Sequence, residues 1–219
     1  MDDDVVQRLA GPRVRSGTAA AACGWLLAGT ACYGAVFGIW RSPEQACVSA
    51  VKMPLFVFLL VAFSALINVL LANVLGARLS SVQVTLCVLM GLAVTAIILL
   101  AVSPIMLFFA LQCPPPSALN AMRVYWALLI AHTAVIGVAG VIGNVRLYRL
   151  LTRLIPSPNV ARRVLASWLL ITGLAGCELS WVLSPFLAKP ALPVPLLNPN
   201  AFTGNFFEYL WRGFLELQR

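Results

Sequence analysis

The sequence predicts an all-α polytopic transmembrane helix bundle with five spans and an amphipathic helix at the C-terminus. Hydrophobic residues make up 61% of the 219 residues and charged residues only 10%, whereas soluble domains carry about 25% charged residues. The apolar residues are gathered into long runs that short basic or proline-rich stretches separate. Because lipid offers backbone polar groups no hydrogen-bond partner, each run is expected to be helical.

Five runs are long enough to cross a bilayer, which takes roughly 20 helical residues. They cover residues 18–40, 53–75, 82–111, 124–145 and 164–188. The third run exceeds the hydrocarbon thickness, so we expect it to tilt, to kink at Pro104 or to extend past the membrane. The alternative for the first run is that it belongs to a cleaved signal peptide. Signal peptides, however, have apolar regions of only about 7–15 residues, shorter than this run. A retained span is therefore the prediction.

Lys and Arg counts predict the orientation. Nine of these residues fall on the side of the N-terminus and six on the opposite side, and the connection between the fourth and fifth runs dominates the bias. By the positive-inside rule the N-terminus lies inside and the C-terminus outside, as in a bacterial inner membrane. The predicted parts are a cytoplasmic segment (1–17), a transmembrane domain (18–188) and a proline-rich segment with the amphipathic helix (189–219).

The basic connection between the fourth and fifth runs has two interpretations. It is a topology signal that also contacts anionic lipid headgroups, or it is a docking patch for an acidic partner or a nucleic acid. No aromatic stacking pattern accompanies the arginines, so we expect no nucleic-acid partner. The first three recur at helical spacing and should line one face of an extension of the fourth helix. The patch consists of Arg146, Arg149, Arg153, Arg162 and Arg163.

Polar residues inside the predicted spans are candidates for function, because they are costly to place in lipid. Glu178 is the only acidic residue in any run, and His132 lies at a matching depth in the preceding run. Consecutive antiparallel helices are often neighbours, so a His132–Glu178 pair is geometrically possible. Tyr33 and Ser103 lie at similar depth and complete a candidate polar cluster.

This cluster has a functional and a structural interpretation. It is a proton or ion relay or a site for a polar ligand, or it consists of ordinary interhelical hydrogen bonds, which average about 0.6 kcal/mol in membranes. For Glu178, contact with a partner subunit is a third possibility. The six cysteines show no metal-site spacing, and no metal or cofactor is expected. Cys47 and Cys113 fall in connections placed outside, where a disulfide between them is a hypothesis.

Small residues predict close helix approach. Gly34 and Gly38 are spaced as GxxxG in the first run, and glycines recur in the fourth. Small residues let helix backbones come together, within one bundle or between oligomer subunits.

The tail after the fifth run contains several prolines and then a helical pattern. Thr203 is the expected N-cap, and the aromatic side chains that follow suit a helix lying in the membrane interface. Packing on the bundle or insertion into a partner is the alternative. The aromatic residues are Phe206, Phe207, Trp211 and Phe214.

The tail also carries a resemblance. The stretch E-L-S-W-V-L-S-P-F, a proline-rich segment and N-F-F-E-Y-L-W cover Glu178 to Trp211. This stretch resembles the end of a group of uncharacterised bacterial five-pass membrane proteins with a W-x-L-R-P-F motif, a group distantly similar to the Yip membrane-trafficking fold. The motif's Arg is Ser184 here, and the resemblance implies no activity.

The sequence predicts a non-enzymatic integral membrane subunit or scaffold of a larger complex, in contact with lipids and with a protein partner or further copies of itself. A small transporter or channel that uses the cluster around Glu178 and His132 is the alternative. A membrane enzyme acting on lipid at the outer leaflet would need a water-accessible His132–Glu178 site. No catalytic motif such as HExxH or GxSxG occurs, so we expect no enzyme.

Overall fold

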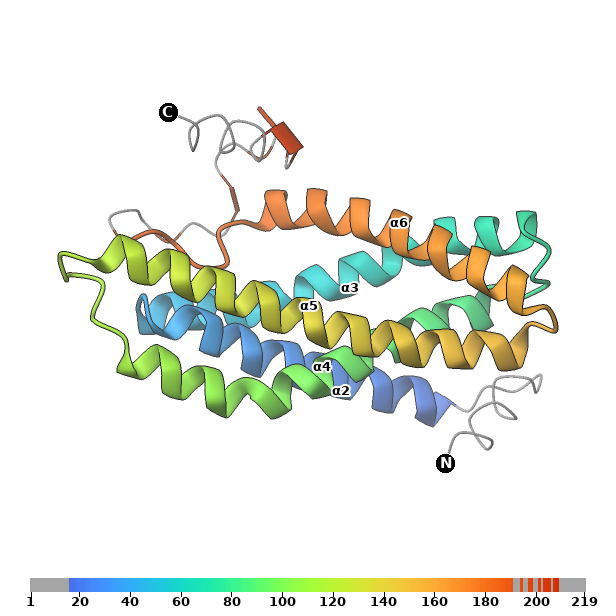
Figure 1. The fold of residues 1–219 in the computed structure, drawn as a ribbon, viewed down its shortest axis with the longest axis horizontal. Helices are drawn as coiled ribbons and strands as arrows, with labels where there is room; N and C mark the ends of the chain where they lie inside the picture. The colour runs from blue at the N-terminus through green and yellow to red at the C-terminus, as the bar shows by residue number, and fades with distance from the viewer. Residues whose placement is uncertain are drawn as a thin grey trace.

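The computed structural model describes residues 16–190, 194, 197–198, 201, 203–205 and 207–208. In this part of the chain all regular structure is helical, and the five long helices are each long and apolar enough to span a membrane, which confirms the predicted fold class. Figure 1 shows them packed lengthwise into one bundle. The helices are α2 (Ser16–Ile39), α3 (Pro43–Val74), α4 (Ser81–Gln112), α5 (Ala121–Leu154) and α6 (Pro158–Leu183).

The helix boundaries extend or shorten several predicted runs. α3 begins at Pro43 and not near residue 53, because the Ser42 side chain accepts a hydrogen bond from Gln45 N (3.1 Å) and Pro43 suits the first helical turn. α5 continues to Leu154, so the helical extension predicted for the fourth run is confirmed. α6 ends at Leu183, before Pro185, and the predicted end at residue 188 is wrong.

The two ends of the bundle differ in their connections. One end, called the tail end here, holds the α2–α3 turn, the α4–α5 loop and the chain that follows α6. The other end, called the arginine end because the five arginines of the basic patch lie there, holds the α3–α4 and α5–α6 turns. Gly76 turns the chain after α3 with φ 77°, a conformation that glycine adopts easily. Ser80 and Gln83 then form a capping box that starts α4.

α2 packs closely against α3 and α4 through glycines. A side chain at Gly34 would overlap the Ser49 carbonyl of α3, and one at Gly38 would overlap the Gln45 carbonyl. The predicted close approach at this GxxxG pair is therefore confirmed. Gly29 meets α4 at Ala96 in the same way. Because these glycines place helix backbones in direct contact, α2 cannot shift without opening both interfaces.

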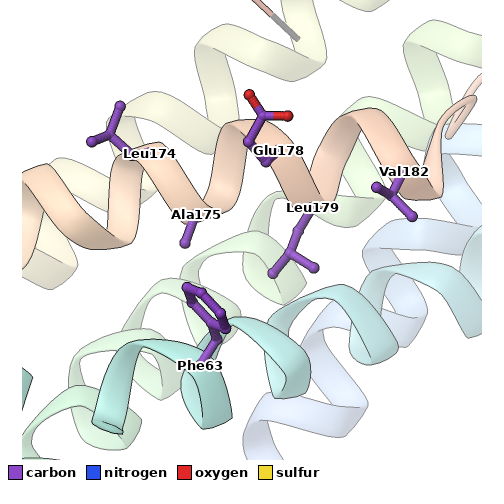
Figure 2. Close-up of a pocket in the computed structure, with 6 residues that line it drawn as sticks. All are labelled: Phe63, Leu174, Ala175, Glu178, Leu179 and Val182. Atoms are coloured by element: carbon purple, nitrogen blue, oxygen red, sulfur yellow. The ribbon is translucent and has the colours of Figure 1, made fainter. Parts of the chain in front are cut away.

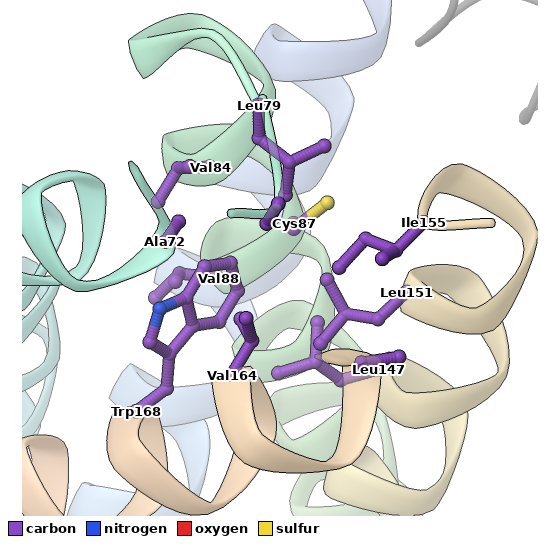
Figure 3. Packing of buried hydrophobic residues seen from close by; sticks show 12 residues of the cluster. Ala72, Leu79, Val84, Cys87, Val88, Leu147, Leu151, Ile155, Val164 and Trp168 are labelled. Atoms are coloured by element: carbon purple, nitrogen blue, oxygen red, sulfur yellow. The ribbon is translucent and has the colours of Figure 1, made fainter. Parts of the chain in front are cut away.

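A hydrophobic cluster fixes the arginine end. Trp168 of α6, Val88 of α4 and Leu151 of α5 all belong to it and are buried, and Figure 3 shows Trp168 beside Val88. The cluster also includes residues of α3 and of the α3–α4 turn. Elsewhere α6 makes most of its contacts with α3 and few with α5, and its apolar stretch is the least buried of the five.

The chain folds back over the bundle after α6. This return segment (residues 184–190) brings Phe186 against the cluster that contains Tyr33 and Met53. Leu187 packs with Phe37 and other residues of a second cluster, and it is only 2% exposed. The return segment is therefore part of the core at the tail end, although it is not helical.

Replacing Gly34 by Ala tests the α2–α3 contact. The added methyl group meets backbone atoms that cannot move aside, so we expect a loss of about 1–3 kcal/mol of stability, measured as a lower melting temperature in detergent. Gly24→Ala is the matched control on the same helix, because a side chain there meets open space. Equal melting temperatures for the two variants would show that the contact is looser than described.

Candidate functional site

A stripe of polar side chains on α3 lies buried at the tail end. Gln45, Ser49 and Lys52 recur at helical spacing, so they share one face of α3. Each of them is 0% exposed. Buried polar groups in a bundle of this kind need partners, because an unpaired hydrogen-bonding group costs about 1–3 kcal/mol.

Backbone carbonyls of the return segment accept hydrogen bonds from the donors of the stripe, whereas Gln45 Oε1 has no hydrogen-bond partner among the described residues. Gln45 Nε2 donates to the Phe186 carbonyl oxygen (2.9 Å) and to Ser49 Oγ (2.9 Å), and the Ser49 hydroxyl donates to the same carbonyl. Lys52 Nζ donates to the Pro185 carbonyl oxygen (3.1 Å). The stripe therefore supplies hydrogen-bond donors to two successive carbonyls, those of Pro185 and Phe186, which lie outside any helix and have no helical hydrogen bonds.

Two further donors close the same end. Arg41 Nε donates to the Lys189 carbonyl oxygen (3.3 Å), so both ends of the return segment are held. Trp40 Nε1 donates to the Pro114 carbonyl oxygen (2.8 Å) of the α4–α5 loop. The acceptors that the return segment and the α4–α5 loop supply to these donors are backbone carbonyls, which suits a structural closure of the bundle.

The stripe is the feature that sequence reasoning missed. With the second span starting near residue 53, Gln45 and Ser49 fall in a loop, and their shared face does not exist. The signal was present in Ser42-Pro43-Glu44, which predicts a helix start, and in the spacing of the polar residues that follow. Extending the helix to Pro43 would have placed Gln45, Ser49 and Lys52 together.

The predicted polar cluster is divided between separate places. Tyr33 and His132 do meet: the Tyr33 oxygen lies 3.0 Å from His132 Nδ1, and the hydroxyl also approaches the His132 carbonyl oxygen (3.4 Å). The Phe37 ring lies against the imidazole, with ring centroids 4.3 Å apart. Ser103 donates to the Leu99 carbonyl of its own helix (2.8 Å). His132 is thus a core histidine between α2 and α5.

Glu178 does not join His132. The matched depth inferred from the sequence is wrong, because α5 begins earlier and α6 ends earlier than predicted. At 1.5 Å per residue, His132 lies about 16 Å from the tail end of α5 and Glu178 about 8 Å from that of α6, and Figure 1 shows that these two helix ends are not level. The few contacts between α5 and α6 also keep the two residues apart.

Glu178 instead lies beside a groove between α3 and α6 with a volume of about 360 Å³. Figure 2 shows Ala175 and Leu179 pointing toward Phe63 of α3, while the Glu178 carboxylate points away from α3. Among the residues that the structure describes, none forms a hydrogen bond or ion pair with this carboxylate. The groove is apolar, and its rim carries one charged group. It is lined by Phe63, Leu174, Ala175, Glu178, Leu179 and Val182.

A second buried polar pair lies on α3 nearer the arginine end. Ser64 and Asn68 are 0% exposed, and the Ser64 hydroxyl and both amide atoms of Asn68 have no hydrogen-bond partner. The backbone carbonyl of Asn68 does accept a bond from Trp168 Nε1 (3.1 Å). The side-chain groups are therefore desolvated without compensation in the described structure.

The other predicted site residues lie apart. Cys47 is exposed and Cys113 half-buried, and both thiols are free, so the structure does not contain the hypothetical disulfide. Among the described residues no three metal-ligating side chains gather as a metal site. The five arginines of the basic patch are all exposed at the arginine end.

The predicted interfacial helix falls largely outside the described residues, which is where Phe206, Trp211 and Phe214 lie. Phe207 is helical and 48% exposed. Asn205 Oδ1 accepts a hydrogen bond from Glu208 N (2.8 Å), so Asn205 caps this turn, a role that the sequence suggests for Thr203.

Comparison with known proteins adds no assignment. The chain matches no protein-family model, no curated protein and no solved structure. The resemblance of the tail to bacterial five-pass proteins therefore stays a prediction.

Removing the Gln45 donor tests the closure of the tail end. In Gln45→Leu the Phe186 carbonyl keeps only Ser49, and we expect a loss of about 1–3 kcal/mol, seen as a lower melting temperature in detergent. Cys47→Ala, at an exposed position of the same helical turns, should leave the melting temperature unchanged. A Gln45→Leu variant as stable as Cys47→Ala would contradict the role of the stripe.

Replacing Asn68 is expected to stabilise the protein, whereas replacing Gln45 is expected to destabilise it. Replacing Asn68 by Leu, which has a similar volume, removes two buried polar atoms that have no partner, so the melting temperature should rise. The Asn68 carbonyl that receives Trp168 is unaffected by the change. A fall in melting temperature would mean that the amide has a partner that this account lacks.

Proposed function

We propose that the chain is a non-enzymatic subunit or scaffold of a larger membrane complex, and that the outward face of α6 receives a partner protein. The observation that carries the proposal is the Glu178 carboxylate, which lies within a span, points away from α3 (Figure 2), and has no partner among the described residues. Charged side chains in membrane spans normally face the protein interior or pair with another group.

The surroundings of Glu178 fit a helix as the partner. Leu170 and Leu174 are 63% and 45% exposed and lie two turns and one turn, respectively, before Glu178 on the same face. Gly173 beside them meets open space where a side chain would be. Exposed leucines next to a small residue allow a second helix to approach closely, and its donor would then reach the carboxylate.

A different chain is favoured over a symmetric pair of copies. A two-fold axis running along this face would place Glu178 against its own copy. Two carboxylates at close range repel, and one of them would have to take up a proton. A partner that brings a basic or amide side chain avoids this cost.

We place the protein in a bacterial inner membrane with the arginine end in the cytoplasm. The support is the exposure of all five patch arginines at that end, as the positive-inside rule requires. The N-terminus then lies inside and the C-terminus outside.

Transport and lipid enzymology have less support. Both depend on His132 and Glu178 acting at one site, and His132 contacts Tyr33 and Phe37 while Glu178 lies at the α3–α6 groove.

Neutralising Glu178 tests the proposal. Glu178→Gln should fold with an unchanged melting temperature and lose most of its partner on purification in mild detergent, because the amide no longer carries the charge that the partner's donor meets. Glu44→Gln removes an exposed carboxylate at the start of α3 and serves as the control. Equal partner recovery in wild type and both variants, or no stable partner in wild type, would end the proposal.

Site-specific cross-linking locates the contact. A photoreactive residue at Leu174 should capture the same partner, whereas one at Leu66, which is 72% exposed on α3, should capture little of it. Capture at Leu66 alone would move the contact away from α6.

A further inference from the structure

The arginine end presents a concentrated positive charge on a rigid support. Arg146, Arg149 and Arg153 lie on the last turns of α5, and Arg162 and Arg163 lie on the first turns of α6. All five are exposed. The exposed Arg78 adds to them from the α3–α4 turn, which packs into the same hydrophobic cluster as the end of α5.

The opposite face of the same hairpin fixes these arginines in place. Leu147 and Leu151 on α5 and Ile155 directly after it are buried in the cluster of Figure 3, as are Ala161 and Val164 on α6. Buried and exposed positions therefore alternate along both helices. The guanidinium groups project from a hairpin that cannot fold away without exposing this core.

The arginines of α5 lie at the outer edge of the headgroup layer and beyond it. α5 has 34 residues, about 51 Å of helix, against a hydrocarbon core of about 30 Å and a bilayer of about 40–45 Å with headgroups. Arg146 lies about 37 Å along α5 from Ala121 and Arg153 about 48 Å. With the start of α5 at one boundary of the hydrocarbon, Arg146 falls at the outer edge of the opposite headgroups. Arg149 and Arg153 lie beyond this edge, and their long side chains can bend back toward the phosphates.

The described chain offers little negative charge at this end. Its acidic residues are Glu44 at the tail end, Glu178, and Glu208 beyond the return segment. Glu178 is about 22 Å along α6 from Arg163. Arg162 bonds to the neutral Oδ1 of Asn159. The positive charge therefore favours an anionic ligand from outside the described chain.

We propose that the arginine end is a binding site for phospholipids with anionic headgroups, of the phosphatidylglycerol class. Guanidinium groups bind phosphate oxygens in pairs of parallel hydrogen bonds, and clusters of basic residues beside a membrane attract anionic lipid. The position of Arg146 at the edge of the headgroups favours lipid over a nucleic acid or an acidic protein, which would approach from the aqueous phase. The inference does not depend on the proposed partner of α6, because it concerns the other end of the bundle.

The test uses the full chain in nanodiscs of phosphatidylcholine mixed with phosphatidylglycerol. After extraction in mild detergent, mass spectrometry measures which lipid stays on the protein. Wild type should retain phosphatidylglycerol several-fold in excess of its share in the disc, and less of it at high salt. The combined Gln variant of Arg146, Arg149, Arg162 and Arg163 should lose this excess.

Two controls separate charge from folding. The same four positions changed to Lys should keep most of the excess, and Arg123→Gln, at the exposed start of α5 in the opposite end, should keep all of it. Melting temperatures identify variants that fail to fold. If the combined variant fails to fold, the single variants Arg149→Gln and Arg163→Gln replace it, and each should lose part of the phosphatidylglycerol excess.

Three results would overturn the proposal. The first is a wild-type protein that shows no preference for phosphatidylglycerol. The second is a preference that the Gln variant keeps. The third is binding of single-stranded RNA or of a polyglutamate peptide to discs of pure phosphatidylcholine, lost in the Gln variant, without enrichment of phosphatidylglycerol.

Discussion

The capture of the return segment's carbonyls by the polar stripe of α3 is the interaction on which the tail end depends. Gln45, Ser49 and Lys52 can reach these carbonyls only because α3 starts at Pro43. In turn, the bonds hold Phe186 and Leu187 in the core. Without them the segment would leave buried donors unpaired on α3 and would withdraw two apolar side chains from the bundle.

The position of α6 follows from this constraint. α6 makes few contacts with α5, so α3 and the cluster at the arginine end hold it along its length, and the return segment holds it at the tail end. This arrangement leaves one side of α6 uncovered, with Glu178 on it. The two proposed surfaces are therefore separated: a protein partner on the flank of α6 and anionic lipid at the arginine end.

Sequence reasoning could predict the five spans, because hydrophobic length decides them. It could also predict the glycine contact of α2 with α3, since Gly34 and Gly38 recur at the spacing that close approach requires. Helix ends were harder to predict. Polar residues such as Gln45 and Lys52 are typical of a loop, and only their hydrogen bonds to the return segment explain their burial. A shift of a few residues in two helix ends was enough to make His132 and Glu178 look level.

The His132 contact shows a different limit. The sequence favours the next helix in the chain as a neighbour, whereas the imidazole meets Tyr33 of α2. Which helices touch depends on side-chain shape along whole interfaces, and the small residues of α2 admit α3 and α4 together. A pattern within one run carries no information about that choice.

The burial of the return segment is the claim to test most directly. In a chain whose Cys47 and Cys113 are replaced by Ala, a cysteine at Ala188, which is 1% exposed, should resist a membrane-impermeant maleimide. A cysteine at the fully exposed Leu119 of the α4–α5 loop, at the same end, should react rapidly. Equal labelling rates at the two positions in the folded protein would contradict the account.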